Sequence, residues 1–354
     1  MNPKVSVVMS VYNGSSYLQE AVNSILNQTF TDFEFIIIDD GSTDSSYSIL
    51  CQFLDKRIKV IKNDKNIGLT KSLNKGLSIA QGKYIARMDA DDISLPERLE
   101  KQVNVLDCSP DIVLVSCNIE IFWNNGMSSE IIRSCESYFV KWYLLFYNHL
   151  GGHGQVLYRK NEMLSLGGYC EDYRYSQDYQ LWSTLSGIGN IFIINEFLYK
   201  QRRHEESIST KKNLEQLSYV VKTSKENIYK LTQIKFEDQI IKDMTNFMVG
   251  IWLSSFFFEI SDLADLDKSV RITYLRFIEN NSLSKSQVKK LKQSIGVRYW
   301  QWFQVTSTKK SLAQKILIAK TAMFWNLSGT LPNGIIFVAN FMKRQKQGLL
   351  DSSK

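Results

Sequence analysis

The sequence has few histidines and few cysteines, and their placement limits the chemistry open to the chain. Only three histidines occur in 354 residues, and the five cysteines are widely scattered, with no C-x-x-C pair among them. This excludes a Cys/His zinc site as the basis of function. We expect the cysteines to be buried thiols in a reducing compartment. They are Cys51, Cys108, Cys117, Cys135 and Cys170.

The sequence also lacks a long hydrophobic run. The nearest approach, residues 247–258, is interrupted by Gly250, Ser254 and Ser255, whereas a spanning helix needs about 18 or more apolar residues. The N-terminus continues directly into Val5-Ser6-Val7-Val8-Met9 without the features of an export signal. We therefore expect a cytoplasmic protein that is soluble or bound at the inner face of the plasma membrane.

Charge is distributed unevenly along the chain. Residues 1–209 carry 20 Lys and Arg against 25 Asp and Glu, whereas residues 210–354 carry 23 against 11. A basic C-terminal region indicates either an anionic partner or a solvated surface. No nucleic-acid-binding module accompanies the charge, so we do not expect a nucleic acid partner.

Short apolar runs of strand length alternate with helical patterns in the first third of the sequence. The runs are residues 5–12, 33–39, 57–63, 83–89 and 111–117. One apolar helical stripe follows Ser16-x-x-Gln19, which resembles a capping box, and another ends before Gly82, where we expect a C′ glycine. This alternation predicts an α/β fold with a mostly parallel sheet that is covered on both faces.

Polar motifs end three of these strands. Tyr12-Asn13-Gly14 ends the first, Asp39-Asp40 the second and Asp89-Ala90-Asp91-Asp92 the fourth. Open α/β sheets bind ligands beyond the carboxyl ends of their strands, so the three motifs should share one rim. A dinucleotide-binding oxidoreductase would need G-x-G-x-x-G after the first strand, and the single Gly14 there argues against it. Nucleotidyl transfer would need a Gly-rich basic loop at the same place, which is also missing.

The five carboxylates on this rim would repel one another unless a cation or hydrogen-bond donors neutralised them. Asp oxygens suit Mg²⁺ or Mn²⁺, which typically bridge protein carboxylates to a diphosphate. The alternative is that Asp91 or Asp92 caps a helix over residues 96–106. A D-x-D-D sequence directly after a strand, together with D-D-G-S-T-D after another, favours the metal.

Five segments together resemble glycosyltransferase family 2, whose members are inverting enzymes with the GT-A fold. They are V-S-V-V-M-S-V-Y-N-G, F-E-F-I-I-I-D-D-G-S-T-D, N-I-G-L-T-K-S-L-N-K-G-L, G-K-Y-I-A-R-M-D-A-D-D and S-Q-D-Y-Q-L-W, in that order. The resemblance covers about residues 3–209. It implies a Rossmann-like GT-A nucleotide-sugar-binding domain over residues 1–209, and the pattern of residues 210–354 predicts a helical, basic C-terminal region.

The resemblance assigns the donor nucleotide to the first two strand ends. Ser10 and Tyr12 match positions that line the base, and Tyr12 offers a stacking face. Asp40 matches the carboxylate that accepts a hydrogen bond from the uracil imide, and Asp39 supports the same loop. UDP is therefore the expected nucleotide. Asp44 fits a helix N-cap better than a ligand position.

The resemblance assigns the diphosphate and the sugar of the donor to residues of the next two segments. Asn66, Gly68 and Lys71 lie on the loop and helix start after the third strand, where glycine permits close backbone approach. Lys71 could neutralise diphosphate charge or lie on a solvated helix face. Asp89 matches the donor ribose or sugar contact.

The metal and the catalytic base are assigned last. Asp91 matches the family's metal ligand, while the extra Asp92 leaves the direct ligand ambiguous between the two. His204, in Arg202-x-His204-x-x-Ser207, matches a histidine that completes the metal shell in some members, and His153 matches a loop near phosphate or acceptor. Asp178 matches the catalytic base, or alternatively an N-cap; the preceding Gln177 departs from the acidic residue often found there.

These assignments imply a metal-dependent hexosyltransferase that moves a sugar from a nucleotide-sugar to a hydroxyl of a glycan or lipid-linked acceptor, in surface polysaccharide or glycolipid synthesis. The alternative is a non-catalytic nucleotide-sugar-binding subunit on the same fold. For residues 210–354, association with an anionic membrane surface and packing on the catalytic domain are both open.

Overall fold

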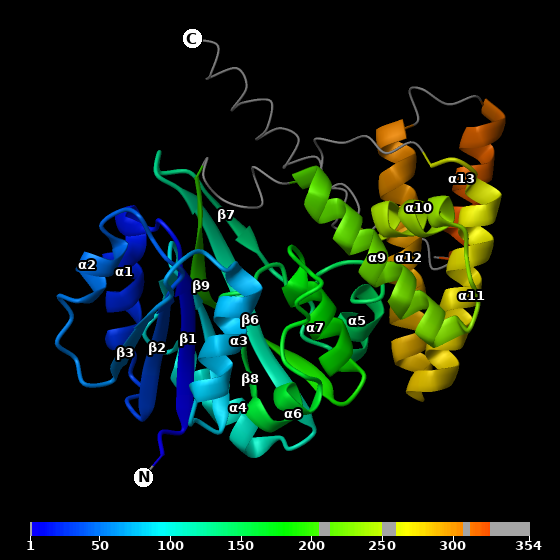
Figure 1. Ribbon diagram of the computed structural model, residues 1–354. Coiled ribbons are helices and arrows are strands. Elements are labelled where there is room, and N and C mark those ends of the chain that lie inside the picture. Colours follow the sequence, from blue (N-terminus) through cyan, green and yellow to red (C-terminus); the bar gives the residue numbers. More distant parts are fainter. Residues whose placement is uncertain (1, 205–212, 250–259, 307–311, 326–354) are drawn as a thin grey trace. The chain divides into compact units, whose positions relative to one another are not determined.

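The computed structural model describes residues 2–204, 213–249, 260–306 and 312–325 (Figure 1). These residues form two compact units, one of residues 2–249 with 260–282 and the other of residues 283–325. The boundary expected near Ser209 lies outside the described residues.

The first unit is built on a sheet whose strand order is β3-β2-β1-β4-β8-β6-β9-β5, with β7 paired to β6. Strands β1, β2, β3 and β4 run parallel, as do β6 and β9, so the prediction of a mostly parallel sheet is confirmed. The short β8 is antiparallel to both of its neighbours. The bounds are β1 (Val5–Val11), β2 (Phe33–Asp39), β3 (Ile58–Lys62), β4 (Tyr84–Asp89), β5 (Ile93–Ser94), β6 (Ile112–Trp123), β7 (Ser128–Ile131), β8 (Leu157–Arg159) and β9 (Asn190–Arg203).

Alternate residues of the central strands enter two different hydrophobic cores. Val5, Val7 and Met9 of β1 pack with α1 (Ser15–Leu26), α2 (Ser46–Leu50) and α4 (Arg98–Cys108), while Val8 packs with the opposite set of helices. Those helices are α3 (Leu69–Ile79), α5 (Ser137–Tyr143), α6 (Lys160–Ser165) and α7 (Gln177–Ser186). Burial on both faces explains why the strands are apolar throughout.

Two local predictions from the sequence were wrong. Helix α1 begins at Ser15, one residue before the supposed capping box, and its N-cap residue is Gly14, which has no side chain to accept a hydrogen bond. The hydroxyl of Ser46 and the carboxylate of Asp44 instead accept the N–H groups of Gly14 and Ser15. Gly82 is not a C′ residue, because α3 already ends at Ile79. Glycine is required there because a Cβ would lie 2.4 Å from the backbone nitrogen of Ser6.

Among the described residues, the first unit also contains α9 (Asn213–Thr232), α10 (Asp238–Val249) and α11 (Leu263–Asn281). The side chain of Asn227 on α9 donates to the carbonyl of Leu144, and Trp142 of α5 packs edge-on against Tyr274 and Phe277 of α11. These contacts attach the start of the basic region to the sheet-containing unit.

The second unit consists, in its described part, of α12 (Lys285–Thr306) and α13 (Leu312–Trp325), which pack on each other. Ile318, Ala322 and Trp325 of α13 are buried, whereas Leu317 and Met323 are 47% and 48% exposed. None of the described helices is long and apolar enough to cross a lipid bilayer.

Candidate active site

The three polar motifs predicted to share a rim do lie together. In the parallel register, Ser10 of β1 is paired with Asp89 of β4, and Val11 is paired with Asp39 of β2. The carboxyl ends of these strands therefore meet at one edge of the sheet (Figure 1).

The loops after β1 and β2 are tied to each other. The side-chain oxygen of Asn13 accepts the backbone N–H of Thr43 at 2.8 Å, and Asn13 itself adopts a left-handed backbone conformation. Beside this contact, Tyr12 is 49% exposed, which leaves its ring accessible. One oxygen of Asp39 accepts the N–H of Ser42, while the other is buried and has no hydrogen-bond partner within the described residues.

The carboxylate of Asp40 organises the loop after β3. Its Oδ1 accepts the backbone N–H of Ile67 at 2.9 Å and the side-chain amide of Asn63 at 2.8 Å, and its Oδ2 accepts the N–H of Gly68 at 2.9 Å. A carboxylate offers about four lone-pair sites. Asp40 is only 2% exposed, and three hydrogen bonds leave one of these sites for a base.

Glycine allows the same loop to approach closely. A Cβ on Gly41 would lie 2.5 Å from the carbonyl carbon of Lys65, and Gly68, which precedes α3, has a φ of +94°. Asn66 and Lys71 are both exposed on this loop and the first turn of α3. Their position beside Asp40 is compatible with donor binding, and their roles stay predictions.

Asp91 and His204 come together from distant parts of the chain. The Nε2 atom of His204 lies 2.9 Å from Oδ2 of Asp91, and both side chains are partly exposed. The guanidinium of Arg202 donates to the Asp91 carbonyl at 3.0 Å, which fixes the end of β9 against the D-x-D-D segment. Tyr17 of α1 packs beside the His204 ring at 5.1 Å.

Asp92 differs from its neighbour. It is only 3% exposed, and its Oδ1 accepts the backbone N–H of Arg202 at 2.8 Å. Burial, together with the charges of Asp91 and Asp89, raises the pKa of Asp92 well above its usual value. This environment suits a structural carboxylate, so the geometry favours Asp91 over Asp92 as the direct metal ligand. Nor does either residue cap a helix at residues 96–106, because α4 begins at Arg98 after Glu97.

The described residues contain no group of three or more His, Cys, Asp or Glu side chains arranged to hold a metal ion. The pair of Asp91 and His204 nevertheless offers a hard carboxylate oxygen and an imidazole nitrogen on an accessible edge. Ions such as Mn²⁺ accept this donor set and take further ligands from a diphosphate. The residues present thus fit a cation that is bound together with the donor.

Asp178 is the second residue of α7, after Ser176, which is held at a φ of 55°. The N-cap position belongs to Ser176, so Asp178 is not the N-cap. Its Oδ2 accepts the side-chain amide of Asn148 at 2.8 Å, and its Oδ1 accepts the N–H of Tyr179 at 2.7 Å. Burial, reinforced by the negative charge of Asp89, raises the pKa of Asp178 to about 6. A general base works best with a pKa near the operating pH.

Two buried arginines below the rim were not predicted from the sequence as residues of the site. Arg87 on β4 is fully buried, and it makes an ion pair with Asp89. Arg98 on α4 is also fully buried and donates to the carbonyls of Arg87 and Gly154. A cation inside the otherwise apolar run Tyr84-Ile85-Ala86-Arg87-Met88 was the available signal.

His153 lies beneath the rim rather than on it. It is 8% exposed, and its Nε2 lies 3.2 Å from Nε of Arg87 and 2.8 Å from the Tyr169 hydroxyl. Burial and the Arg87 cation hold the pKa of His153 well below its usual value. A buried neutral ring of this kind is placed to support its neighbours.

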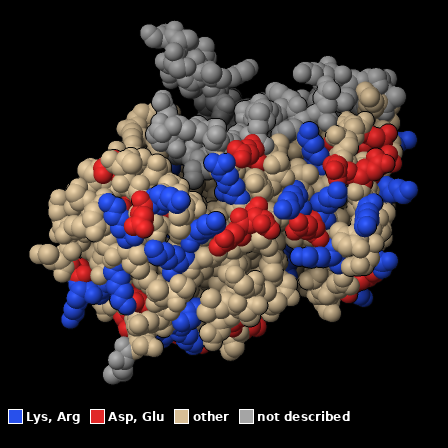
Figure 2. All heavy atoms as spheres, in the orientation of Figure 1, with Lys and Arg blue, Asp and Glu red and all other residues tan. Residues whose placement is uncertain are grey.

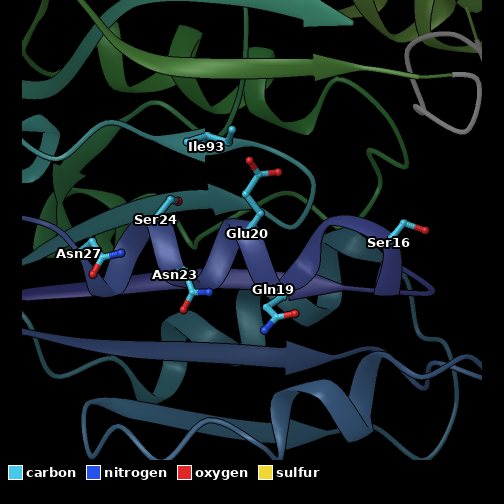
Figure 3. Close-up of a pocket in the computed structure, with 7 residues that line it drawn as sticks. All are labelled: Ser16, Gln19, Glu20, Asn23, Ser24, Asn27 and Ile93. Atoms are coloured by element: carbon cyan, nitrogen blue, oxygen red, sulfur yellow. The ribbon is translucent and has the colours of Figure 1, made fainter. Parts of the chain in front are cut away.

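A separate shallow groove runs along the outer face of α1 (Figure 3). Glu20, at one side of it, forms an ion pair with Arg202. The candidate donor, metal and base residues do not line this groove, so it is distinct from the rim. Its lining is Ser16, Gln19, Glu20, Asn23, Ser24, Asn27 and Ile93.

Comparison with known proteins assigns the chain to a family. The sequence profile "Glycosyl transferase family 2" matches residues 6–161. An uncharacterized glycosyltransferase of Haemophilus influenzae is 35% identical over 267 residues, covering 69% of this chain and 79% of that protein. The Escherichia coli protein WfgD, named a UDP-Glc:alpha-D-GlcNAc-diphosphoundecaprenol beta-1,3-glucosyltransferase, is 30% identical, covering 59% of this chain and 80% of its own.

Among solved structures, residues 1–349 of S. aureus TarS in complex with UDP-GlcNAc superpose with a TM-score of 0.56. The two sequences are 16% identical, and the match covers 84% of this chain and 87% of that one. This likeness shows the GT-A fold that the sequence predicted.

Proposed function

Because this chain belongs to glycosyltransferase family 2, we propose that it transfers a hexose from a nucleotide-sugar, with UDP the preferred nucleotide, to a hydroxyl of a glycan or lipid-linked acceptor. The observation that carries the proposal is the position of Asp178. Burial and the negative charge of Asp89 raise the pKa of Asp178 to about 6, which supports a role as the base. The name of the E. coli relative, which includes a UDP-sugar and a diphosphoundecaprenol-linked sugar, supports both substrate classes.

In this proposal the reaction is a single displacement with inversion. The hydroxyl oxygen of the acceptor attacks the anomeric carbon from the face opposite the nucleoside diphosphate, which leaves. Asp178 accepts the proton of that hydroxyl during the attack. A base in this position contributes about 10²- to 10⁴-fold to the rate. Asp91 and His204 would hold a divalent cation, which supplies charge stabilisation to the leaving diphosphate. Asp89, fixed by Arg87, would orient the donor.

The direct test is a screen of nucleotide-sugars for hydrolysis and transfer with Mn²⁺ present. We expect release of the nucleoside diphosphate from one or a few UDP-sugars. A non-catalytic subunit would bind the same donor in a calorimetric titration but release no diphosphate, and that outcome would replace the proposed activity with a sensing role.

Replacing Asp40 with Ala should raise the donor KM more than it lowers kcat, because a contact with the base is equally strong in the ground and transition states. The change also removes the acceptor of three hydrogen bonds that order the loop at Gly68. Donor KM, kcat and Tm are measured together, with Asp40→Asn as the variant that keeps one acceptor. A fall in kcat with an unchanged KM would move Asp40 into the chemistry.

Association with an anionic membrane surface would suit a lipid-linked acceptor. On the face shown in Figure 2, the Lys and Arg side chains of the described residues are interspersed with Asp and Glu, so charge alone does not mark a membrane-facing patch there. Helix α13 exposes four apolar side chains, those of Ile316, Leu317, Met323 and Phe324. Of these, Leu317 and Met323 are the better candidates, since the exposed Lys320 lies between them in the sequence. Exposed apolar side chains next to a lysine can insert into such a surface, with the lysine facing the anionic head groups.

We therefore expect the double substitution Leu317→Glu with Met323→Glu to weaken binding to vesicles of anionic phospholipid by about tenfold or more, since losing the two partly buried apolar side chains together costs at least roughly 1.4 kcal/mol. Leu275→Glu on α11 is the matched control, because Leu275 is similarly exposed at 51%. Vesicle cosedimentation measures the effect. Equal binding by the wild type and the double variant would contradict membrane association through α13.

A further inference from the structure

The fully buried Arg87 makes polar contacts in several directions below the rim. Its Nη1 donates to the carbonyls of Val8 at 2.9 Å and Met88 at 2.5 Å, and its Nε donates to Nε2 of His153 at 3.2 Å. Its Nη2 pairs with the carboxylate of Asp89. Guanidinium donors have a fixed planar arrangement. The position of Arg87 therefore ties the positions of Asp89 and His153 to each other.

The contact with His153 has a defined direction. Arginine can only donate, and its Nε and Nη2 atoms lie 3.2 Å from Nε2 and 3.4 Å from Nδ1 of His153, so one nitrogen of the neutral imidazole must accept from Arg87. The Tyr169 hydroxyl lies 2.8 Å from the same Nε2 atom. A side chain at position 153 must therefore present an acceptor to Arg87, because leaving a buried charged donor unpaired is costly.

His153 belongs to a loop, residues 148–155, that reaches the candidate base. At one end of this loop, Asn148 donates to Oδ2 of Asp178. At the other end, the Gln155 carbonyl accepts the side-chain amide of Gln102 at 2.7 Å, and the Gln155 side chain donates back to the Leu150 carbonyl at 3.0 Å. The loop of residues 148–155 is therefore held at both of its ends, between β4 and α7.

The next residue, Gly154, brings this loop against the donor motif. A Cβ at position 154 would lie 1.8 Å from the hydroxyl oxygen of Tyr199 and 3.0 Å from Oδ2 of Asp89. Its carbonyl is held by Arg98 at 2.5 Å. The loop therefore lies close to Asp89 at Gly154 and makes hydrogen bonds to Arg87 through His153 and to Asp178 through Asn148.

We propose that Arg87 is a positioning residue that couples the donor half of the site to the base half. It holds Asp89 directly and sets the position of Asp178 through His153 and the loop to Asn148. This inference rests on the proposed function, since it takes Asp178 as the base. It assigns a role to the arginine that precedes the D-x-D-D segment and to the His153 imidazole.

The test compares two substitutions of His153. Leu fills much of the same space but cannot accept from Arg87, whereas the side-chain oxygen of Gln can. We expect His153→Leu to lower kcat by about tenfold or more with the donor KM nearly unchanged, since misplacing a catalytic group by about 1 Å costs up to 10²-fold. His153→Gln should restore kcat to within about threefold of wild type, because it renews the hydrogen bond.

A second pair of variants separates positioning from stability. Arg87→Met should raise the donor KM and lower kcat together, because it affects both halves of the site. Arg159 is the matched control, because its guanidinium also donates to backbone carbonyls, those of Leu106, Ser109 and Ile112. In the sheet, however, Arg159 of β8 lies opposite Tyr84, at the end of β4 far from Asp89. Arg159→Met should lower Tm and leave kcat within about twofold of wild type.

Three outcomes would overturn the coupling. They are wild-type kcat in His153→Leu, an equal loss in the Leu and Gln variants, and a loss of kcat in Arg159→Met as large as in Arg87→Met. Asp178→Asn is measured in the same series. If it is inactive while His153→Leu is active, only the coupling fails; if it is as active as wild type, the proposed base fails.

Discussion

Asp178→Asn should lower kcat by about 10²-fold or more while leaving the donor affinity nearly unchanged. Asn keeps the shape of the side chain and one oxygen for the N–H of Tyr179, but it cannot take a proton from the acceptor hydroxyl. The second oxygen, which now accepts from Asn148, is lost. Against this loss, a neutral amide avoids the burial of charge that raises the pKa of Asp178 to about 6. The two effects on stability oppose each other, so we expect little change in Tm.

Turnover and Tm are measured on the same preparations of Asp178→Asn and Asp178→Ala. A purely structural carboxylate predicts the opposite pattern, with Asn tolerated and Ala, which loses both hydrogen bonds, destabilising by about 1–3 kcal/mol. In the wild type, kcat should rise with pH through about 6, because the base acts only when ionised. Near-wild-type turnover of the Asn variant would require another base within residues 130–209.

The sheet and the rim could be predicted from the sequence because their signals are local. The continuous apolar pattern of strands such as Phe33–Asp39 is easily distinguished from the spaced apolar pattern of helices. Polar residues that end parallel strands lie together, because the carboxyl ends of such strands share one edge of the sheet. The approach of His204 to Asp91 needed the family resemblance, since 113 positions separate the two residues and no local pattern connects them.

The residues that support the rim could not be predicted in the same way. The Ser16 capping box failed because Asp44, on the loop after β2, and Ser46, the first residue of α2, accept the N–H groups at the start of α1. Arg87 stood in an apolar run, but its acceptor His153 lies 66 positions away on a loop without regular structure. Hydrogen-bond partners that are distant in the sequence determine which polar side chains can be buried. Such pairs cannot be identified from local patterns in a single sequence.

Asp91→Ala should abolish transfer and remove the dependence of donor binding on Mn²⁺, because Asp91 is the accessible carboxylate next to His204. Losing the cation removes several kcal/mol of charge stabilisation from the leaving diphosphate. Asp91 is partly exposed and its carboxylate contacts the ring of His204, so we expect the folded protein to keep its Tm. Donor affinity with and without Mn²⁺, by calorimetric titration, and kcat at saturating Mn²⁺ are the measurements.

Asp92→Ala is the matched comparison, and the structure predicts a different kind of loss. Asp92 is buried and accepts the N–H of Arg202, so its removal leaves a buried donor without a partner and should cost about 1–3 kcal/mol of stability. The Arg202 guanidinium also holds the Asp91 carbonyl, so some loss of kcat should accompany the lower Tm.

Metal-dependent donor binding should nevertheless persist in Asp92→Ala and be absent in Asp91→Ala. If Asp92→Ala loses the Mn²⁺ dependence with an unchanged Tm while Asp91→Ala retains it, the ligand is Asp92. If Asp91→Ala turns over at the wild-type rate without added metal, the site does not use a cation at this position.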